Sequence, residues 1–220
     1  MEISITIIII AITCVVSFIA FTNHNLLDQF IFYPPAVGRG QFYRFFSCGL
    51  IHADWGHLIF NMIALYMFGQ IVESKFVEIF DQFGKLIYLG MYVLALAASV
   101  IPTYFNNKDN YHYRSLGASG GVSAVIFAGI MFFPLVGIGL FFIPVYIAGF
   151  LFGILYLVFS GLLDKRGGGN INHSAHIFGA LFGVGFTIIV CQAFSDYPLL
   201  KDFVYQIQHM SMSDVFQTGR

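Results

Sequence analysis

Charged side chains are scarce in this 220-residue sequence. Lys and Arg number 10 and Asp and Glu number 11, which together make up 10% of the chain, against roughly 25% in an ordinary soluble domain. This scarcity excludes a water-soluble globule and a disordered chain. The near-zero net charge provides no basic surplus for phosphates, so no nucleic-acid partner is expected. Hydrophobic residues make up 58% of the chain, which points to a membrane protein.

Cysteine is also rare. Cys14, Cys48 and Cys191 show no paired spacing, which argues against a disulfide framework or a zinc site. The N-terminus has no positively charged start and no small-residue cleavage site, and its apolar run is too long for the core of a signal peptide. We therefore expect residues 3–22 to form a first membrane helix.

Long apolar stretches divide the rest of the chain into further expected helices. A transmembrane helix needs about 20 residues, so six helices need about 120. The charge-free run 115–163 is too long for one crossing and is split at Pro134, Gly137, Gly139 and Pro144. The sequence predicts an all-α polytopic membrane protein with one domain, residues 1–195, and a polar tail without a recognisable motif, residues 196–220. The expected spans are 3–22, 52–72, 85–104, 116–135, 141–162 and 173–194.

Positive charges in the expected loops do not agree with a cytoplasmic N-terminus. In that orientation the inner side would carry Lys75, Lys85, Lys201 and Arg220. The outer loops would carry Arg39, Arg44, Lys108, Arg114, Lys165 and Arg166. The positive-inside rule therefore mildly favours the opposite orientation.

Polar side chains at three places within the expected spans indicate function, because burying them must be compensated. His57 and Asn61 are four residues apart and share a helical face. Ser119 lies in the first turn of the expected span 116–135, near free backbone N–H groups and the positive end of the helix dipole. His176 shares a helical face with Gly179 and Gly183, which allow close approach to a partner helix. Each feature taken alone is compatible with ordinary helix packing.

Together these residues supply the parts of an acyl-transfer site. A serine needs a base within hydrogen-bond reach to act as a nucleophile. The oxyanion that forms on attack at a carbonyl needs fixed N–H donors. Ser119 offers the nucleophile and His176 a candidate base, while His57 and Asn61 offer side-chain donors.

Three motifs resemble those of the rhomboid intramembrane serine proteases. Residues 117–120, GASG, resemble the family's GxSG motif, and residues 52–61, HADWGHLIFN, resemble its second-helix motif. Residues 175–183, AHIFGALFG, resemble its AHxxGxxxG signature. Tyr43 and Arg44 resemble an aromatic-Arg pair of the family's first loop, and Glu73 falls where the family has a structural glutamate. The resemblance covers about residues 40–185, in the family's order.

The resemblance implies a six-helix rhomboid-like bundle with a water-filled cavity. Ser119 would be the nucleophile and His176 the general base of a dyad, with His57, Asn61 and the Ser119 backbone N–H as the oxyanion hole. The implied structural residues are His52, Arg44, Glu73, His173, Gly117, Gly120, Gly179 and Gly183. The substrate would be a transmembrane segment of another protein, entering between the second and fifth helices and unwinding locally. No cofactor or metal is expected.

The resemblance also implies a location and shows two departures. It places the protein in a membrane, as a stand-alone bacterial-type enzyme of the inner membrane, with an inward N-terminus and a cavity open to the outer face. Ser123 stands where many family members have an aromatic ring that stacks on the catalytic histidine, so the ring would come from elsewhere or the imidazole would be held loosely. The glycine-rich loop 164–172 lacks a bulky apolar plug, which predicts a mobile cap.

Three other functions fit the sequence less well. A haem- or metal-binding bundle would use paired histidines, but His52 and His57 are five apart and His173 and His176 three apart, so neither pair has the i, i+4 spacing. An inactive rhomboid relative would usually lack the serine or the histidine. A small-solute transporter would usually show an internal repeat or a mid-span charge, and neither is visible.

Overall fold

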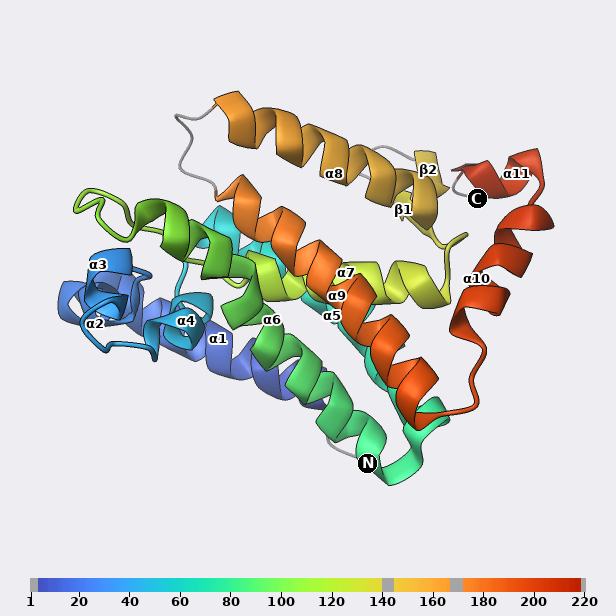
Figure 1. Ribbon diagram of the computed structural model, residues 1–220, viewed down its shortest axis with the longest axis horizontal. Helices are drawn as coiled ribbons and strands as arrows, with labels where there is room; N and C mark the ends of the chain where they lie inside the picture. Colours follow the sequence, from blue (N-terminus) through green and yellow to red (C-terminus); the bar gives the residue numbers. More distant parts are fainter. Residues whose placement is uncertain (1–3, 140–144, 167–171, 219–220) are drawn as a thin grey trace.

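The computed structural model describes residues 4–139, 145–166 and 172–218, and these residues are mostly helical (Figure 1). The six long helices are α1 Ile5–Thr22, α5 Trp55–Phe80, α6 Gly84–Asn107, α7 Ser119–Phe132, α8 Gly149–Arg166 and α9 His173–Phe194. The short helices are α2 His24–Phe30, α3 Pro34–Val37, α4 Arg44–Ser47, η1 Cys48–Leu50, η2 Asp81–Phe83, α10 Leu199–Gln208 and α11 Met212–Val215. The strands β1 Gly137–Gly139, β2 Val145–Ala148 and β3 Phe216–Thr218 form one antiparallel sheet in the order β1-β2-β3.

The expected helices lie close to the observed ones, with one clear error. Helix α8 begins at Gly149, whereas the sequence predicted a span from 141, because residues 145–148 pair with two other strands as β2. Helix α7 ends at Phe132, before Pro134, so it is shorter than the predicted span 116–135. Proline lacks the N–H that the next helical hydrogen bond needs.

Three stretches of the described residues are long and apolar enough to cross a membrane: Ile5–Thr22, Trp55–Asn107, which contains α5 and α6, and His173–Phe194. Helix α7 is apolar but has only 14 residues, about 21 Å at 1.5 Å per residue. Helix α8 ends in Asp164, Lys165 and Arg166. The protein is therefore an integral membrane protein, and six crossings remain a prediction.

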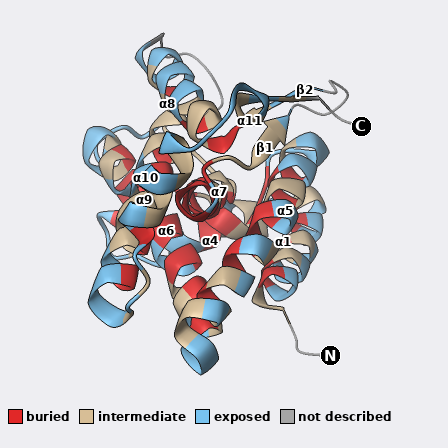
Figure 2. Cartoon of the chain, turned by 90° about the vertical axis from the view of Figure 1, so that its right-hand side faces the viewer, coloured by how far each residue is buried: buried red, intermediate tan, exposed pale blue. Residues whose placement is uncertain are grey.

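Helix α7 lies at the centre of the bundle. Every residue from Gly120 to Phe132 except Ile126 is buried, and Figure 2 shows the helix end-on among α5, α6 and α9. Its N-terminal half is rich in glycine and alanine, so neighbouring helices approach its backbone closely. A site at the start of α7 is consequently enclosed on several sides.

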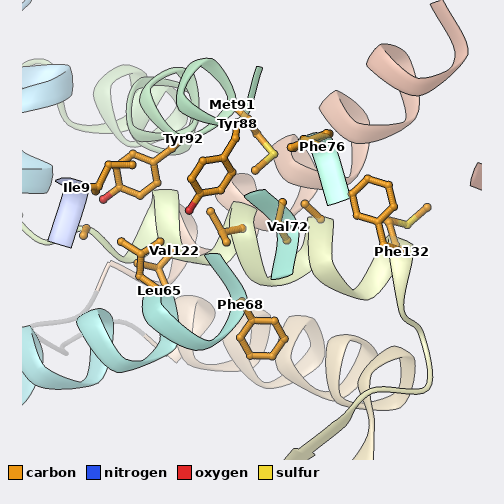
Figure 3. Packing of buried hydrophobic residues seen from close by; sticks show 14 of the residues in the cluster. Ile9, Leu65, Phe68, Val72, Phe76, Tyr88, Met91, Tyr92, Val122 and Phe132 are labelled. Atoms are coloured by element: carbon orange, nitrogen blue, oxygen red, sulfur yellow. The ribbon is translucent and has the colours of Figure 1, made fainter. Parts of the chain in front are cut away.

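The main core lies between α1, α5, α6 and α7 (Figure 3). Aromatic rings fill much of it, and the rings of Phe76 and Phe132 meet edge-on with centroids 5.5 Å apart. Glu73 closes one end of this core by accepting hydrogen bonds from Ser4, Ile5 and Thr6 at the start of α1. These bonds satisfy amide groups that a helix N-terminus would otherwise leave free.

The segment 196–220, expected as a polar tail, contains α10, α11 and β3 within its described part. Leu199 is fully buried, and the Gln206 side chain donates to the Phe132 carbonyl at the end of α7. The ring of Tyr197 lies under the Lys75 ammonium group at 4.7 Å. Strand β3 pairs with β2 directly before α8, so this segment packs on the bundle.

Candidate active site

A cavity of about 390 Å³ lies between the N-terminal ends of α5, α7 and α9. Its lining includes all four side chains that the sequence suggested for chemistry: His57, Asn61, Ser119 and His176. They come from three segments that together spread over more than a hundred residues of the chain, and the fold brings them together. The walls are otherwise mainly small and apolar residues, among them Leu96, Val100, Gly117, Gly120 and Ala175.

Helix caps place two of these side chains in the first turns of their helices. The Asp54 carboxylate accepts a hydrogen bond from the His57 backbone N–H at 2.8 Å and caps α5. The Asn172 side chain accepts from the Ala175 N–H at 3.0 Å and caps α9. Such caps stabilise a helix start by roughly 1 kcal/mol, and here they define where the cavity walls begin.

Helix α7 differs, because its N-cap residue is Ala118, whose side chain has no group that could accept a hydrogen bond from the first turn. Ser119 is its first residue, and both Ser119 and Gly120 line the cavity. An uncapped helix start combines free N–H groups with the positive end of the helix dipole and favours negative charge. The start of α7 is therefore suited to stabilising an anion at the position of Ser119.

Asn61 carries an unsatisfied donor at this cavity. Its side chain is only 8% exposed, and its Nδ2 atom has no hydrogen-bond partner among the residues that the structure describes. Leaving a buried donor unpaired costs roughly 1–3 kcal/mol, so such groups call for a functional explanation. An oxygen atom of a bound molecule would satisfy it.

Gly117 allows the His57 ring to reach the same cavity. Gly117 has φ +118°, a conformation that favours glycine. A Cβ atom there would also lie 2.6 Å from the His57 ring. Gly117, two residues before Ser119, thus satisfies both a backbone and a packing requirement.

Two glycines of α9 bring that helix against α7. A Cβ atom on Gly179 would overlap the carbonyl oxygen of Gly120, and one on Gly183 would overlap that of Ala124. A Cβ on Gly120 itself would overlap the Ser99 side chain. The backbones of α7 and α9 are consequently in direct contact, as the sequence spacing suggested, and this contact places His176 beside the start of α7.

An aromatic ring from α8 stacks on His176. The Tyr156 and His176 rings have centroids 6.1 Å apart and an interplanar angle of 18°. The Tyr156 hydroxyl shares a hydrogen bond of 2.8 Å with Ser123, the residue that replaces the expected aromatic on α7. Sequence reasoning left the source of this ring open. The one sign of this ring in the sequence was Tyr156 itself, a residue with a polar group within the apolar run 145–163.

His52 holds the segments that precede α5 and α7. It lies in the connection before α5, outside the three apolar stretches that could cross a membrane, and is 1% exposed. The Ser17 hydroxyl donates to the Leu50 carbonyl, so its oxygen accepts from His52 Nδ1–H at 2.9 Å, while His52 Nε2 accepts from the Ala118 N–H at 3.3 Å. Burial, helped by the nearby His57, lowers the pKa of His52 to about 3, which agrees with this neutral form.

The remaining predicted residues lie further from the cavity. Arg44 is buried and donates to Gln41 and to the carbonyl oxygens of Asp28 and Ile31, which joins parts of the segment 23–44. His173 meets the His176 ring edge-on at 5.8 Å. The expected mobile cap, 164–172, falls largely on residues 167–171, which lie outside the described residues.

No group of three His, Cys, Asp or Glu side chains gathers at a metal-binding distance within the described ranges. In the same ranges no hydrogen bond joins Ser119 to His176, although both line the cavity. Contacts of this kind are often long without substrate and tighten only in the reacting complex.

The fold and the site define an integral membrane protein with a mainly apolar cavity that holds a few polar side chains at the start of its central helix. The family model for the Rhomboid domain matches residues 39–193, which is more than half of the chain. The chain therefore belongs to the rhomboid family, whose members are typically serine proteases.

Three relatives agree with this assignment. The chain is 29% identical over 169 residues to RHOMBOID-like protein 12, mitochondrial, of Arabidopsis thaliana, covering 73% of this chain and 50% of that one. It is 30% identical over 175 residues to Rhomboid-related protein 1 of Caenorhabditis elegans, covering 76% and 45%. It is 27% identical over 175 residues to YdcA of Bacillus subtilis, named as a candidate rhomboid protease, covering 76% and 77%. The chain thus spans about half the length of the first two relatives.

Proposed function

We propose that this protein is an intramembrane serine endopeptidase that cleaves transmembrane segments of other membrane proteins with Ser119 and His176. The observation that carries the proposal is the shared cavity, in which a serine at an uncapped helix start, a histidine and a buried unpaired amide meet. Membership of the rhomboid family supports the same reaction.

In the proposed reaction, the His176 imidazole takes the proton from Ser119 Oγ as that oxygen attacks the scissile carbonyl carbon. The C–N bond then breaks, the leaving amine takes the proton from His176, and the acyl group stays on Ser119. A water molecule then gives a proton to His176 as it attacks the acyl carbon. The bond between that carbon and Ser119 Oγ breaks, Ser119 Oγ takes the proton back from His176, and the carboxylic acid product leaves. The two steps together require one nucleophile and one acid–base group, and the side chains in the cavity provide both.

The negative oxygen formed in each attack needs preorganised donors. Asn61 Nδ2–H, a ring N–H of His57 and the backbone N–H of Ser119 are the donors that we assign to it. The unpaired state of Asn61 Nδ2 favours this role, since binding the oxyanion would remove an existing cost.

We infer that the substrate enters laterally between α5 and α8. A helical peptide bond is shielded by its own hydrogen bonds, so the segment must unwind locally before Ser119 can attack. Small residues near the cut would ease that unwinding, because the cavity of about 390 Å³ leaves little room for bulky side chains on both sides of the bond.

We place the cavity toward the outer face of a bacterial inner membrane, with the N-terminus inside. The motif resemblance supports this orientation and the positive charges in the loops oppose it. A cysteine introduced at Lys108 should react with a membrane-impermeant thiol reagent in intact cells, relative to the unsubstituted chain. Absence of labelling would contradict the orientation.

The central test is cleavage of a model transmembrane substrate in liposomes. We expect the wild type to cut and Ser119→Ala and His176→Ala to be inactive while melting at wild-type temperatures. Labelling by a serine-reactive phosphonate provides a second readout that depends only on the protein. Cleavage by Ser119→Ala, or a wild type that neither cuts nor labels, would contradict the proposal.

Asn61→Ala separates the oxyanion role from a structural one. We expect kcat to fall by about a hundredfold or more, with no loss of thermal stability, because Asn61 Nδ2 has no hydrogen bond to lose. Tyr66→Phe is the matched control on the exposed side of α5 and should retain wild-type kcat. An Asn61→Ala variant with wild-type kcat would remove Asn61 from the oxyanion hole.

A further inference from the structure

We propose that Tyr156 is a positioning residue for the His176 imidazole and that Ser123 holds Tyr156 in place, so that part of the support of the base lies on α8. This inference rests on the proposed function of His176. It concerns two residues for which the three motifs supply no role.

The stacking of the two rings carries the first step. Their centroids are 6.1 Å apart and their planes differ by 18°, within the range of offset stacking between aromatic rings. A ring parallel to the imidazole opposes its rotation out of the stack. His173 lies edge-on to the same imidazole at 5.8 Å, so His176 is held between two rings.

The Tyr156 ring is itself held from three directions. Phe127 of α7 and Phe152 of α8 lie with ring centroids 5.7 and 5.9 Å away. The phenol hydroxyl, which needs a partner in an apolar setting, shares its hydrogen bond with Ser123 at 2.8 Å. Ser123 is only 2% exposed, so little water competes for this bond.

The position of Ser123 links this contact to the nucleophile. Ser123 lies four residues after Ser119 on α7 and thus about one turn along the same helix. The helix that carries the nucleophile therefore also anchors the ring that orients the base. This arrangement fixes how α7, α8 and α9 are positioned relative to one another at the site.

Few residues of helix α8 are buried against the rest of the protein. Among its described residues, the buried ones are Gly149, Gly153 and Ser160. The Ser123–Tyr156 bond is the one side-chain hydrogen bond between α8 and the other long helices in the described part of the chain. Loss of this bond would free α8 to move outward and take the ring away from His176.

The test is a variant series assayed for kcat and KM across pH. Tyr156→Leu removes the ring, Tyr156→Phe and Ser123→Ala remove the hydrogen bond, and Phe159→Leu is the control for ring loss on the exposed side of α8. We expect Tyr156→Leu to lower kcat by about tenfold to a hundredfold, as small misplacements of catalytic groups do. Its KM should stay near wild type and the acidic limb of its pH profile should shift.

The two hydrogen-bond variants are expected to lose several-fold in kcat each. The double variant Ser123→Ala with Tyr156→Phe should lose no more than either single variant, because both remove the same bond. Additive losses would contradict the role of Ser123. Wild-type kcat and an unchanged pH profile in Tyr156→Leu would overturn the proposal, provided that wild type and Phe159→Leu cut and Ser119→Ala does not.

A spectroscopic readout keeps the inference testable if no cleavage is found. In protein with isotope-labelled histidine, the His176 ring resonance is assigned by its disappearance in His176→Ala. Tyr156→Leu should shift this resonance by removing the ring current of the stacked phenol. Phe194→Leu, which removes an exposed ring at the far end of α9, should leave it in place. An unshifted resonance in Tyr156→Leu would overturn the positioning role independently of activity.

Discussion

Helices α9 and α8 both flank α7 near His176, and they pack against it in different ways. On one side, α7 and α9 meet through glycines with their backbones in contact, and His52 ties the start of α7 to α1. On the other side, α8 meets α7 mainly through rings and one hydrogen bond. Ser119, the proposed nucleophile, thus lies where two helix backbones are in contact. The ring that stacks on His176, the proposed base, lies on a helix with fewer contacts.

This difference suggests how one site could be both precise and accessible. Chemistry needs catalytic groups held within a fraction of an ångström, and the glycine contacts of α7 provide that. A transmembrane substrate needs an entrance, and α8, which has fewer contacts than α9, can move aside at lower cost. The comparison predicts that the same substitution will have very different effects on the two sides.

The largest effect is expected for Gly179→Ala. The new methyl group would overlap the Gly120 backbone carbonyl, which cannot move aside as a flexible side chain could. Overpacking typically lowers the free energy of unfolding by about 1–3 kcal/mol, and occasionally by more. Because the neighbour here is backbone, we expect a cost at the upper end of that range. Activity should also be lost, because α9 carries His176.

Gly185→Ala is the matched control for that substitution. It lies on the same helix, but a Cβ atom there meets nothing within 4 Å, so stability should be unchanged or slightly increased. Thermal melting of both variants in one detergent measures the difference. Equal melting temperatures would show that α7 and α9 are not in direct backbone contact.

An intermediate effect is expected from acid acting on His52. The unfolded chain binds a proton at His52 below about pH 6.5, while the folded protein, with the pKa lowered to about 3, does not. The unfolded state therefore binds more protons, and stability falls as the pH decreases. Between pH 7.5 and 5 this amounts to on the order of 2 kcal/mol.

His52→Gln removes this titration and provides the comparison. The variant should be less stable than wild type at pH 7.5, because the bonds to Ser17 and Ala118 are lost. Its stability should then fall less between pH 7.5 and 5, so the two proteins converge. Denaturant unfolding at both pH values measures this, and parallel pH curves would show that His52 is not a buried neutral residue.

Much of this site could be predicted from the sequence, for local reasons. Ser119, Asn61 and Gly179 stand out because polar or very small residues in apolar helices follow a helical spacing. The early start predicted for the fifth helix was wrong, because β2 pairs with a strand near residue 217 that no local pattern reveals. Tyr156 was missed for the same reason, since a stacking partner from another helix depends on tertiary packing.

The smallest effect is expected for Gly153→Ala, where α8 approaches α7. A Cβ atom there would lie 3.3 Å from the edge of the Phe127 ring, and a side chain can shift by a few tenths of an ångström. Higher helix propensity of alanine, worth up to about 1 kcal/mol, acts in the opposite direction. We expect a net change below about 1 kcal/mol in thermal melting, far less than for Gly179→Ala. A loss as large as that of Gly179→Ala would mean that α8 is packed as tightly as α9, and the contrast between these two helices would then be wrong.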